Sequence, residues 1–323
     1  MKVNELREII KQYSKQEDEK IIVELYKKIP KSIKEDYSID DFIVNLKGKI
    51  EKEDKNVTID ILEKQINYFL DCAMNNLYSS PNRVISKIER SKWRFKAKSF
   101  YKQLNTFLPT TEEGEKATDL LRDLFETLSY GSNYLIFSSW NTFGAIGVQQ
   151  SDFLKNIVER KLVNGITKEN MEYCIKLLFV KRDPQEYHRA IRYSFESCLK
   201  TSDARYMAIE ILDKKIEELE VKYKKKPDFE NKERLNDFIE CVVEIYFDLY
   251  EIQKGIKYFH EKYIEKDKEI KEYILLDVLE SFRLYNEWIL EYESKMKKIN
   301  YRDSLKEKYE KIKNSDNKKE FLD

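Results

Sequence analysis

The sequence predicts an all-α fold: an irregular α-solenoid or stacked helical bundle of about ten helices, with long antiparallel helices near the C-terminus. Three observations support this class. Glycine and proline are scarce, at 7 and 5 of 323 residues, whereas sheet proteins need many turns that use both. Residues that cap helices recur ahead of apolar segments. Within those segments the apolar residues recur at steps of three and four, the spacing of one helix face.

Cap residues mark the expected helix starts in order along the chain. Ser14 with Glu17 forms the pattern of a capping box, in which each residue satisfies a backbone N–H of the other. Further starts are expected at Ser38, Thr58, Thr111, Thr167 and Ser202. Residues 83–108 are expected to form one helix. The Asp183–Pro184 pair is expected to open another, with proline at its first position.

Two very long helices are predicted at 229–263 and 266–298. At 1.5 Å per residue, each would be about 50 Å long. An apolar stripe of that length needs a neighbour of similar length, so we expect an antiparallel pair with 203–225 as a third member. The chain then divides into an N-terminal helical region, a central region and a C-terminal long-helix bundle, at 1–110, 111–200 and 201–323.

Composition excludes several classes of function. Basic and acidic residues number 60 each, which argues against bulk polyelectrolyte binding but leaves local patches open. Four widely spaced cysteines and two histidines predict buried free thiols in a reducing cytoplasm, with no metal or other cofactor. No run of about 20 apolar residues occurs and the N-terminus lacks a secretory signal, so no membrane partner is expected. The enzyme motifs GxGxxG, GxxxxGK[ST], GxSxG and HExxH are also absent.

The segment 127–151 carries no charged residue, although 37% of the chain is charged. One interpretation is a buried central helix, "NYLIFSSWNTF", whose serines bond back to the backbone. The other is a pocket or partner surface, because amides supply directional hydrogen bonds and aromatic rings supply contact area. Under that interpretation the candidate binding residues are Asn133, Tyr134, Trp140 and Asn141.

Residues 83–102 carry eight basic residues against Glu89 alone. Five of them fall at steps of three and four and would share one helix face; we call Arg83, Lys87, Arg90, Arg94 and Lys98 the basic ridge. Such a ridge could bind phosphates or an acidic partner, so nucleic acid is a candidate ligand.

A second set of charges offers the ridge an internal partner. We call Asp237, Glu240, Glu244, Asp248 and Glu251 the acidic stripe; these residues recur at similar steps, with no basic residue between Leu235 and Gln253. The stripe and the ridge could neutralise each other within one molecule or across a homodimer, or both could be solvated faces.

The third candidate is "RDPQEYH", from Arg182 to His188. Its pattern of Arg, Asp, four residues and His resembles the motif of HEPN-type ribonucleases, which are all-α proteins, often dimeric, of phage-defence and toxin systems. The resemblance covers seven residues. It implies that Arg182 would stabilise the scissile phosphate and that His188 would act as general acid or base without a metal.

These patterns favour a non-enzymatic helical interaction or scaffold protein that binds a protein, peptide or nucleic-acid partner. The alternatives are a metal-independent ribonuclease and a regulatory protein with a small-ligand pocket around Trp140.

Overall fold

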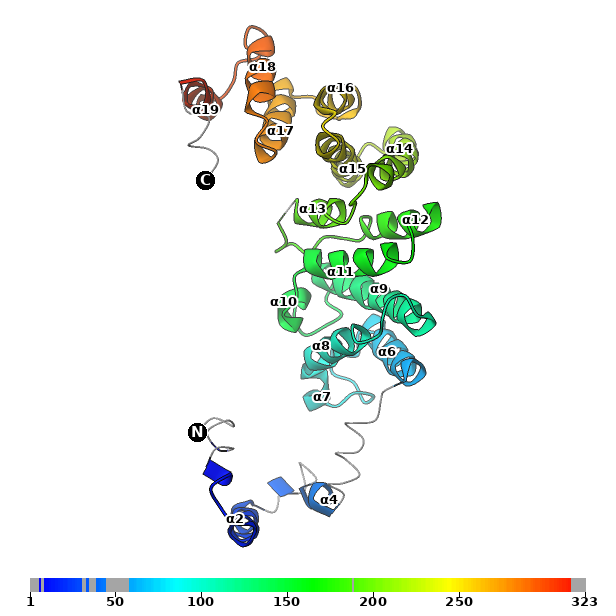
Figure 1. The fold of residues 1–323 in the computed structure, drawn as a ribbon, viewed down its shortest axis with the longest axis vertical. Helices are drawn as coiled ribbons and strands as arrows, with labels where there is room; N and C mark the ends of the chain where they lie inside the picture. Colours follow the sequence, from blue (N-terminus) through cyan, green and yellow to red (C-terminus); the bar gives the residue numbers. More distant parts are fainter. Residues whose placement is uncertain are drawn as a thin grey trace. The chain divides into compact units, whose positions relative to one another are not determined.

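The computed structural model describes residue 6 and residues 9–30, 33–34, 39–44, 58–187 and 189–314 (Figure 1). The chain divides into two compact units, Met1–Thr58 and Ile59–Asp323. All regular structure in the described ranges is helical, which confirms the predicted all-α class. The three regions expected from the sequence stay a prediction. No helix among these residues combines the length and the apolar character needed to cross a membrane.

The first unit contains α2 (Lys15–Lys28) and α4 (Ile39–Val44). The predicted capping box is confirmed, because the Ser14 side chain accepts from the backbone of Glu17 while the Glu17 carboxylate accepts from the backbone of Ser14. The expected cap at Ser38 lies outside the described residues.

The second unit is a succession of packed helices. Its first half consists of α6 (Ile59–Met74), α7 (Lys87–Ser91), α8 (Trp93–Leu104), α9 (Glu112–Asn133), α10 (Thr142–Ile146), α11 (Gln150–Leu162) and α12 (Lys168–Leu177). The caps predicted at Thr111 and Thr167 are confirmed, since each side chain accepts a backbone N–H three residues on. Helix α9 is central here, because α6, α8, α10 and α11 all pack against it.

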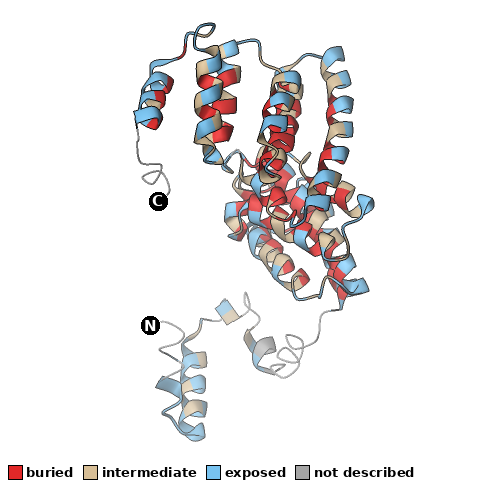
Figure 2. Ribbon diagram, turned by 45° about the horizontal axis from the view of Figure 1, so that its top comes forward, coloured by how far each residue is buried: buried red, intermediate tan, exposed pale blue. Residues whose placement is uncertain are grey.

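The second half consists of α13 (Ala190–Glu196), α14 (Ser202–Lys225), α15 (Phe229–Asp248), α16 (Ile252–Lys262), α17 (Lys268–Ser281), α18 (Tyr285–Lys295) and α19 (Asp303–Asn314). Neighbours in sequence pack in pairs from α14 to α16 and from α17 to α19, and Figure 2 shows buried residues along the faces where the helices meet. This arrangement agrees with the predicted stack, and α14 packs on α15 as expected.

The prediction of two very long helices is wrong, because each predicted helix is interrupted near its middle. The first becomes α15 and α16, separated at Tyr250, and the second becomes α17 and α18, separated at Arg283. Both residues have left-handed backbone, with φ of 59° and 57°. The following N–H groups, of Glu251 and Leu284, reach back to carbonyls five residues earlier. These are Schellman ends, at which a helix stops and the chain reverses.

Two further helix predictions are corrected. Residues 83–108 form α7 and α8 with a break at Lys92, because Ser86 accepts from the N–H of Glu89 and starts a short helix of its own. The Asp183–Pro184 pair does not open a helix: residues 181–187 have no regular structure, and α13 begins at Ala190.

The four cysteines are buried free thiols, as predicted. Burial raises the pKa of Cys198 to about 11 and that of Cys174 to about 12. Burial also raises the pKa of Cys241 well above its ordinary value. All three are protonated near neutral pH and therefore pack as small apolar groups.

Candidate functional site

A cleft of about 470 Å³ lies in the second unit between the segment 177–184, α13 and α15. Its lining combines apolar side chains with charges of both signs and two amides. The lining includes Phe179, Phe238, Lys181, Arg182, Arg192, Arg234, Glu230, Asp237, Asn133 and Gln150.

Amides of the uncharged segment hold one wall of this cleft. The buried Gln150 donates through Nε2 to the carbonyl oxygen of Lys181 at 3.0 Å and accepts through Oε1 from the N–H of Asp183 at 2.7 Å. Asn133 donates through Nδ2 to the carbonyl oxygen of Arg182 at 3.1 Å. These bonds replace the ladder that a strand or helix would supply, so segment 181–183 has a fixed backbone without regular structure.

An aromatic pair, one ring from the segment 177–184 and one from α15, also lines the cleft. The rings of Phe179 and Phe238 stack with centroids 4.2 Å apart. The guanidinium of Arg234 lies 4.9 Å from the Phe179 ring centroid, and its Nη2 donates to the Phe179 carbonyl oxygen at 2.6 Å. The cleft therefore offers an apolar surface with a fixed cation beside it.

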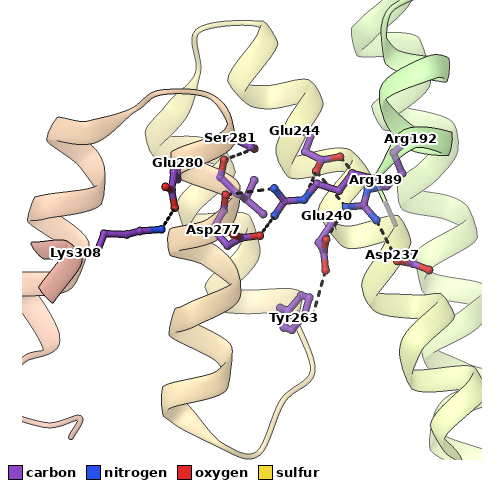
Figure 3. A network of polar contacts seen from close by, with 11 residues as sticks. Arg189, Arg192, Asp237, Glu240, Glu244, Tyr263, Asp277, Glu280, Ser281 and Lys308 are labelled. Carbon is purple, nitrogen blue, oxygen red and sulfur yellow. Dashed lines mark hydrogen bonds and ion pairs between the residues drawn. The ribbon is translucent and has the colours of Figure 1, made fainter. Parts of the chain in front are cut away.

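A buried network of ion pairs reaches the cleft through Arg192 and Asp237, which line it. Figure 3 shows the guanidinium of Arg192 among three carboxylates of α15, at 3.1 Å from Asp237, 2.7 Å from Glu240 and 2.9 Å from Glu244. Arg189, the N-cap of α13, donates to Asp277 of α17 at 2.7 Å and lies 3.7 Å from Glu244. The network therefore joins α13, α15 and α17.

Burial and neighbouring charges shift the pKa values of the carboxyl groups of this network in opposite directions. Burial raises the pKa of Glu240, and burial with the charge of Glu244 raises the pKa of Glu196 well above its ordinary value. For Glu244, burial is opposed and outweighed by the charge and hydrogen bonds of Arg192, so its pKa is lowered. Burial therefore favours the protonated form of Glu196, whereas Arg192 favours the ionised form of Glu244.

The acidic stripe pairs with cations that do not belong to the basic ridge. Its first three carboxylates bind Arg192 of α13. Asp248 lies 3.8 Å from Nη2 of Arg205 of α14, and Glu251 pairs with Lys254 of α16 at 2.7 Å. The basic ridge is a separate surface. Arg83, Lys87 and Arg94 are exposed and Arg90 and Lys98 are half-buried, and no ion pair to these five is found in the described ranges. The break at Lys92 also means that they do not share a single helix face.

The four residues predicted in the uncharged segment do not all line the cleft. Asn133 lines the cleft, whereas Asn141 caps α10 by accepting from the N–H of Gly144 at 2.8 Å. Tyr134 is exposed and its hydroxyl accepts from Lys181 at 3.0 Å. Trp140 is 54% exposed. The interpretation as a central helix "NYLIFSSWNTF" is wrong, because α9 ends at Asn133 and residues 134–141 are not helical.

The Arg182–His188 motif is described only in part. Arg182 lines the cleft, while His188 lies outside the described residues. Asp183 between them is buried, which raises its pKa.

The sequence reasoning missed Arg192, Phe179 and Phe238. A signal for Arg192 existed, because an acidic stripe without bases needs cations from another segment, and "AIRYSFES" places this arginine on an apolar helical pattern. The two phenylalanines carried no signal that distinguished them from core residues.

Comparison with known proteins adds no relative: no family model, curated protein or solved structure matches the chain.

Proposed function

We propose that the chain is a non-enzymatic helical interaction module whose cleft binds a segment of a partner protein. The observation that supports this is the lining of the cleft, where stacked aromatic rings and charges of both signs face a volume of about 470 Å³. Peptide grooves combine these features, since apolar pockets bind side chains and fixed polar groups set orientation.

The charges suggest how such a segment would be oriented. Lys181 and Glu230 face each other at the rim, 3.5 Å apart, and their side chains are 46% and 76% exposed. An exposed pair of this kind contributes about 0–1 kcal/mol, so it can exchange its partners for charges on a ligand. An apolar residue of the ligand would contact Phe179 and Phe238, while a flanking carboxylate would bind Lys181 and Arg182.

Selection from a random peptide library displayed on phage tests the proposal. We expect enriched peptides to bind the wild-type chain and to lose at least tenfold in affinity for the double variant Lys181→Glu, Arg182→Glu, because the two introduced carboxylates repel the carboxylate of the peptide. The matched control is Lys224→Glu, Lys225→Glu, which makes the same charge change on exposed residues of α14. Equal weakening by both variants, or no enrichment, would count against the cleft.

The basic ridge supports a second candidate, contact with single-stranded RNA, because its cations are not neutralised by the acidic stripe. We expect Lys87→Gln, Arg94→Gln to weaken RNA binding and to reduce the slope of log affinity against log salt by about 0.7 for each phosphate contact removed. Fluorescence anisotropy at several salt concentrations measures this slope. An unchanged slope would show that these two exposed residues do not contact phosphate.

The ribonuclease alternative is motivated by Arg182 lining the cleft. If it holds, labelled RNA incubated with the chain in chelator should be cleaved by the wild type, and the rate should fall about 100-fold or more in His188→Ala, since removing a general acid or base typically costs that much. Absence of cleavage by the wild type, or equal cleavage by His188→Ala, rejects it.

A further inference from the structure

A second cluster of polar groups lies away from the cleft, where α16, α17 and α18 meet. Each helix supplies one residue: His260 from α16, Glu272 from α17 and Glu291 from α18. One potential ligand atom from each lies within 4.8 Å of the others. Glu272 is only 2% exposed, so its carboxylate has left bulk water.

A cation already sits where these three groups converge. The Lys295 ammonium lies 2.9 Å from His260 Nε2, 2.6 Å from Glu272 Oε2 and 2.8 Å from Glu291 Oε2. The neighbouring Lys271 does not share this role, because its Nζ donates to the backbone carbonyl oxygens of His260 and Tyr263. Around Lys295 itself, two carboxylates face one ammonium, and the charge of Lys271 acts on Glu272 from outside this group.

The Lys295 ammonium does not satisfy every hydrogen-bonding atom of the three residues. Glu272 Oε1 is buried and has no hydrogen-bond partner among the described residues. His260 Nε2 also lies 3.0 Å from Glu291 Oε2. If His260 Nε2 carries a proton, its N–H points at the Lys295 ammonium, which is also a donor. If His260 Nε2 carries no proton, its lone pair lies against the Glu291 carboxylate oxygen, which is also an acceptor. No placement of one hydrogen satisfies both contacts while Lys295 is charged.

We propose that His260, Glu272 and Glu291 form a binding site for a divalent transition-metal ion of the zinc class, and that Lys295 occupies this site as an exchangeable cation. A metal ion accepts lone pairs from the imidazole nitrogen and from both carboxylates, so the conflict of hydrogens disappears. Its two positive charges match the two carboxylates. Lys295 is the last residue of α18 and its side chain is 26% exposed, so the amine can swing into solvent.

The ion would tie together three helices from two hairpins, α15–α16 and α17–α18. Because the ion binds only when the three helices are folded together, its binding free energy raises the free energy of unfolding. The bound ion would therefore stabilise the contact between these helices. Imidazole with carboxylates suits zinc better than magnesium or calcium, which prefer oxygen ligands alone.

Calorimetric titration of the chelator-stripped full chain with Zn²⁺ tests the site. We expect one saturable ion per chain, at least tenfold weaker binding in His260→Ala and unchanged binding in His188→Ala, which removes the other of the two histidines. Lys295→Met should bind Zn²⁺ more tightly than the wild type, because the competing cation is gone. No saturable binding by the wild type, or equal binding by His260→Ala, overturns the proposal.

A spectroscopic measurement covers the case in which His260→Ala fails to fold. With two histidines, the imidazole resonances of the wild type are two sets, and the His188→Ala variant assigns them. Stoichiometric Zn²⁺ should shift the His260 set alone. A shift confined to His188, or no shift, contradicts the site.

Discussion

Replacing Arg192 with methionine is expected to lower the free energy of unfolding by about 3–5 kcal/mol, the usual cost of removing one partner from a buried ion-pair network. Arg192 is the only side chain of α13 that reaches Asp237, Glu240 and Glu244 together in the described structure. Without it, Glu240 and Glu244 must either stay charged in the interior or take up protons. Urea denaturation followed by circular dichroism measures the loss.

The size of this loss depends on pH. In the wild type, Glu244 has a lowered pKa, so it contributes stability that is present above the unfolded value of 4.5 and lost as pH falls through the folded value. Glu196 has a raised pKa, so its effect is opposite and stability falls as pH rises above 4.5. Removing Arg192 removes the cause of the lowered value at Glu244. The difference in unfolding free energy between wild type and variant should therefore narrow as pH falls. The narrowing begins above 4.5, where the buried Glu244 of the variant takes up a proton, and is complete below the lowered pKa of Glu244 in the wild type.

Arg205→Met is the matched control for the buried arginine. Arg205 pairs with Asp248 at 3.8 Å and its side chain is 25% exposed, so less than about 1 kcal/mol is expected. Equal losses in the two variants, or a gap that does not change with pH, would mean that the Arg192 network does not behave as a buried ion-pair cluster.

The second large effect is expected at Trp93. Its side chain is 1% exposed, its ring stacks on Phe137 with centroids 4.2 Å apart, and its Nε1 donates to Ser138 Oγ at 3.0 Å. Trp93→Ala should cost about 3–5 kcal/mol, because it opens a cavity under the uncharged segment. Thermal or urea unfolding measures the cost.

Trp140 provides the matched control, since it is a tryptophan of the uncharged segment itself but lies 54% exposed. Trp140→Ala should change stability by no more than about 0.5 kcal/mol. Similar losses at Trp93 and Trp140 would contradict the packing described for residues 134–141.

Helix starts could be predicted because a cap is a local signal. A serine or threonine at Ser14, Thr111 and Thr167 needs only the next three residues to make its hydrogen bond, and all three caps are confirmed. The helix breaks could not be predicted, because the residue that ends a Schellman motif is usually glycine, and here Tyr250 and Arg283 take that place. The apolar periodicity continues past both breaks and conceals them.

Only separate parts of the cleft could be recognised in the sequence. The uncharged segment and the Arg182 motif were each noticeable in the sequence, yet their meeting depends on Asn133 and Gln150 binding the backbone of residues 181–183. Hydrogen bonds to a backbone leave no complementary side chain for a sequence pattern to reveal. The His260, Glu272 and Glu291 cluster was missed for another reason, since each helix contributes one residue and no spacing links them.

Hydrogen–deuterium exchange of the full chain with a peptide from the display selection tests the central claim most directly. If the cleft binds the partner segment, added peptide should slow exchange in residues 177–184 and in the first half of α15, where Phe238 and Asp237 line it. The same peptide should leave α7 and α8 unchanged. Protection confined to α7 and α8, or no protection at 177–184 at saturating peptide, would contradict the assignment of the cleft as the binding site.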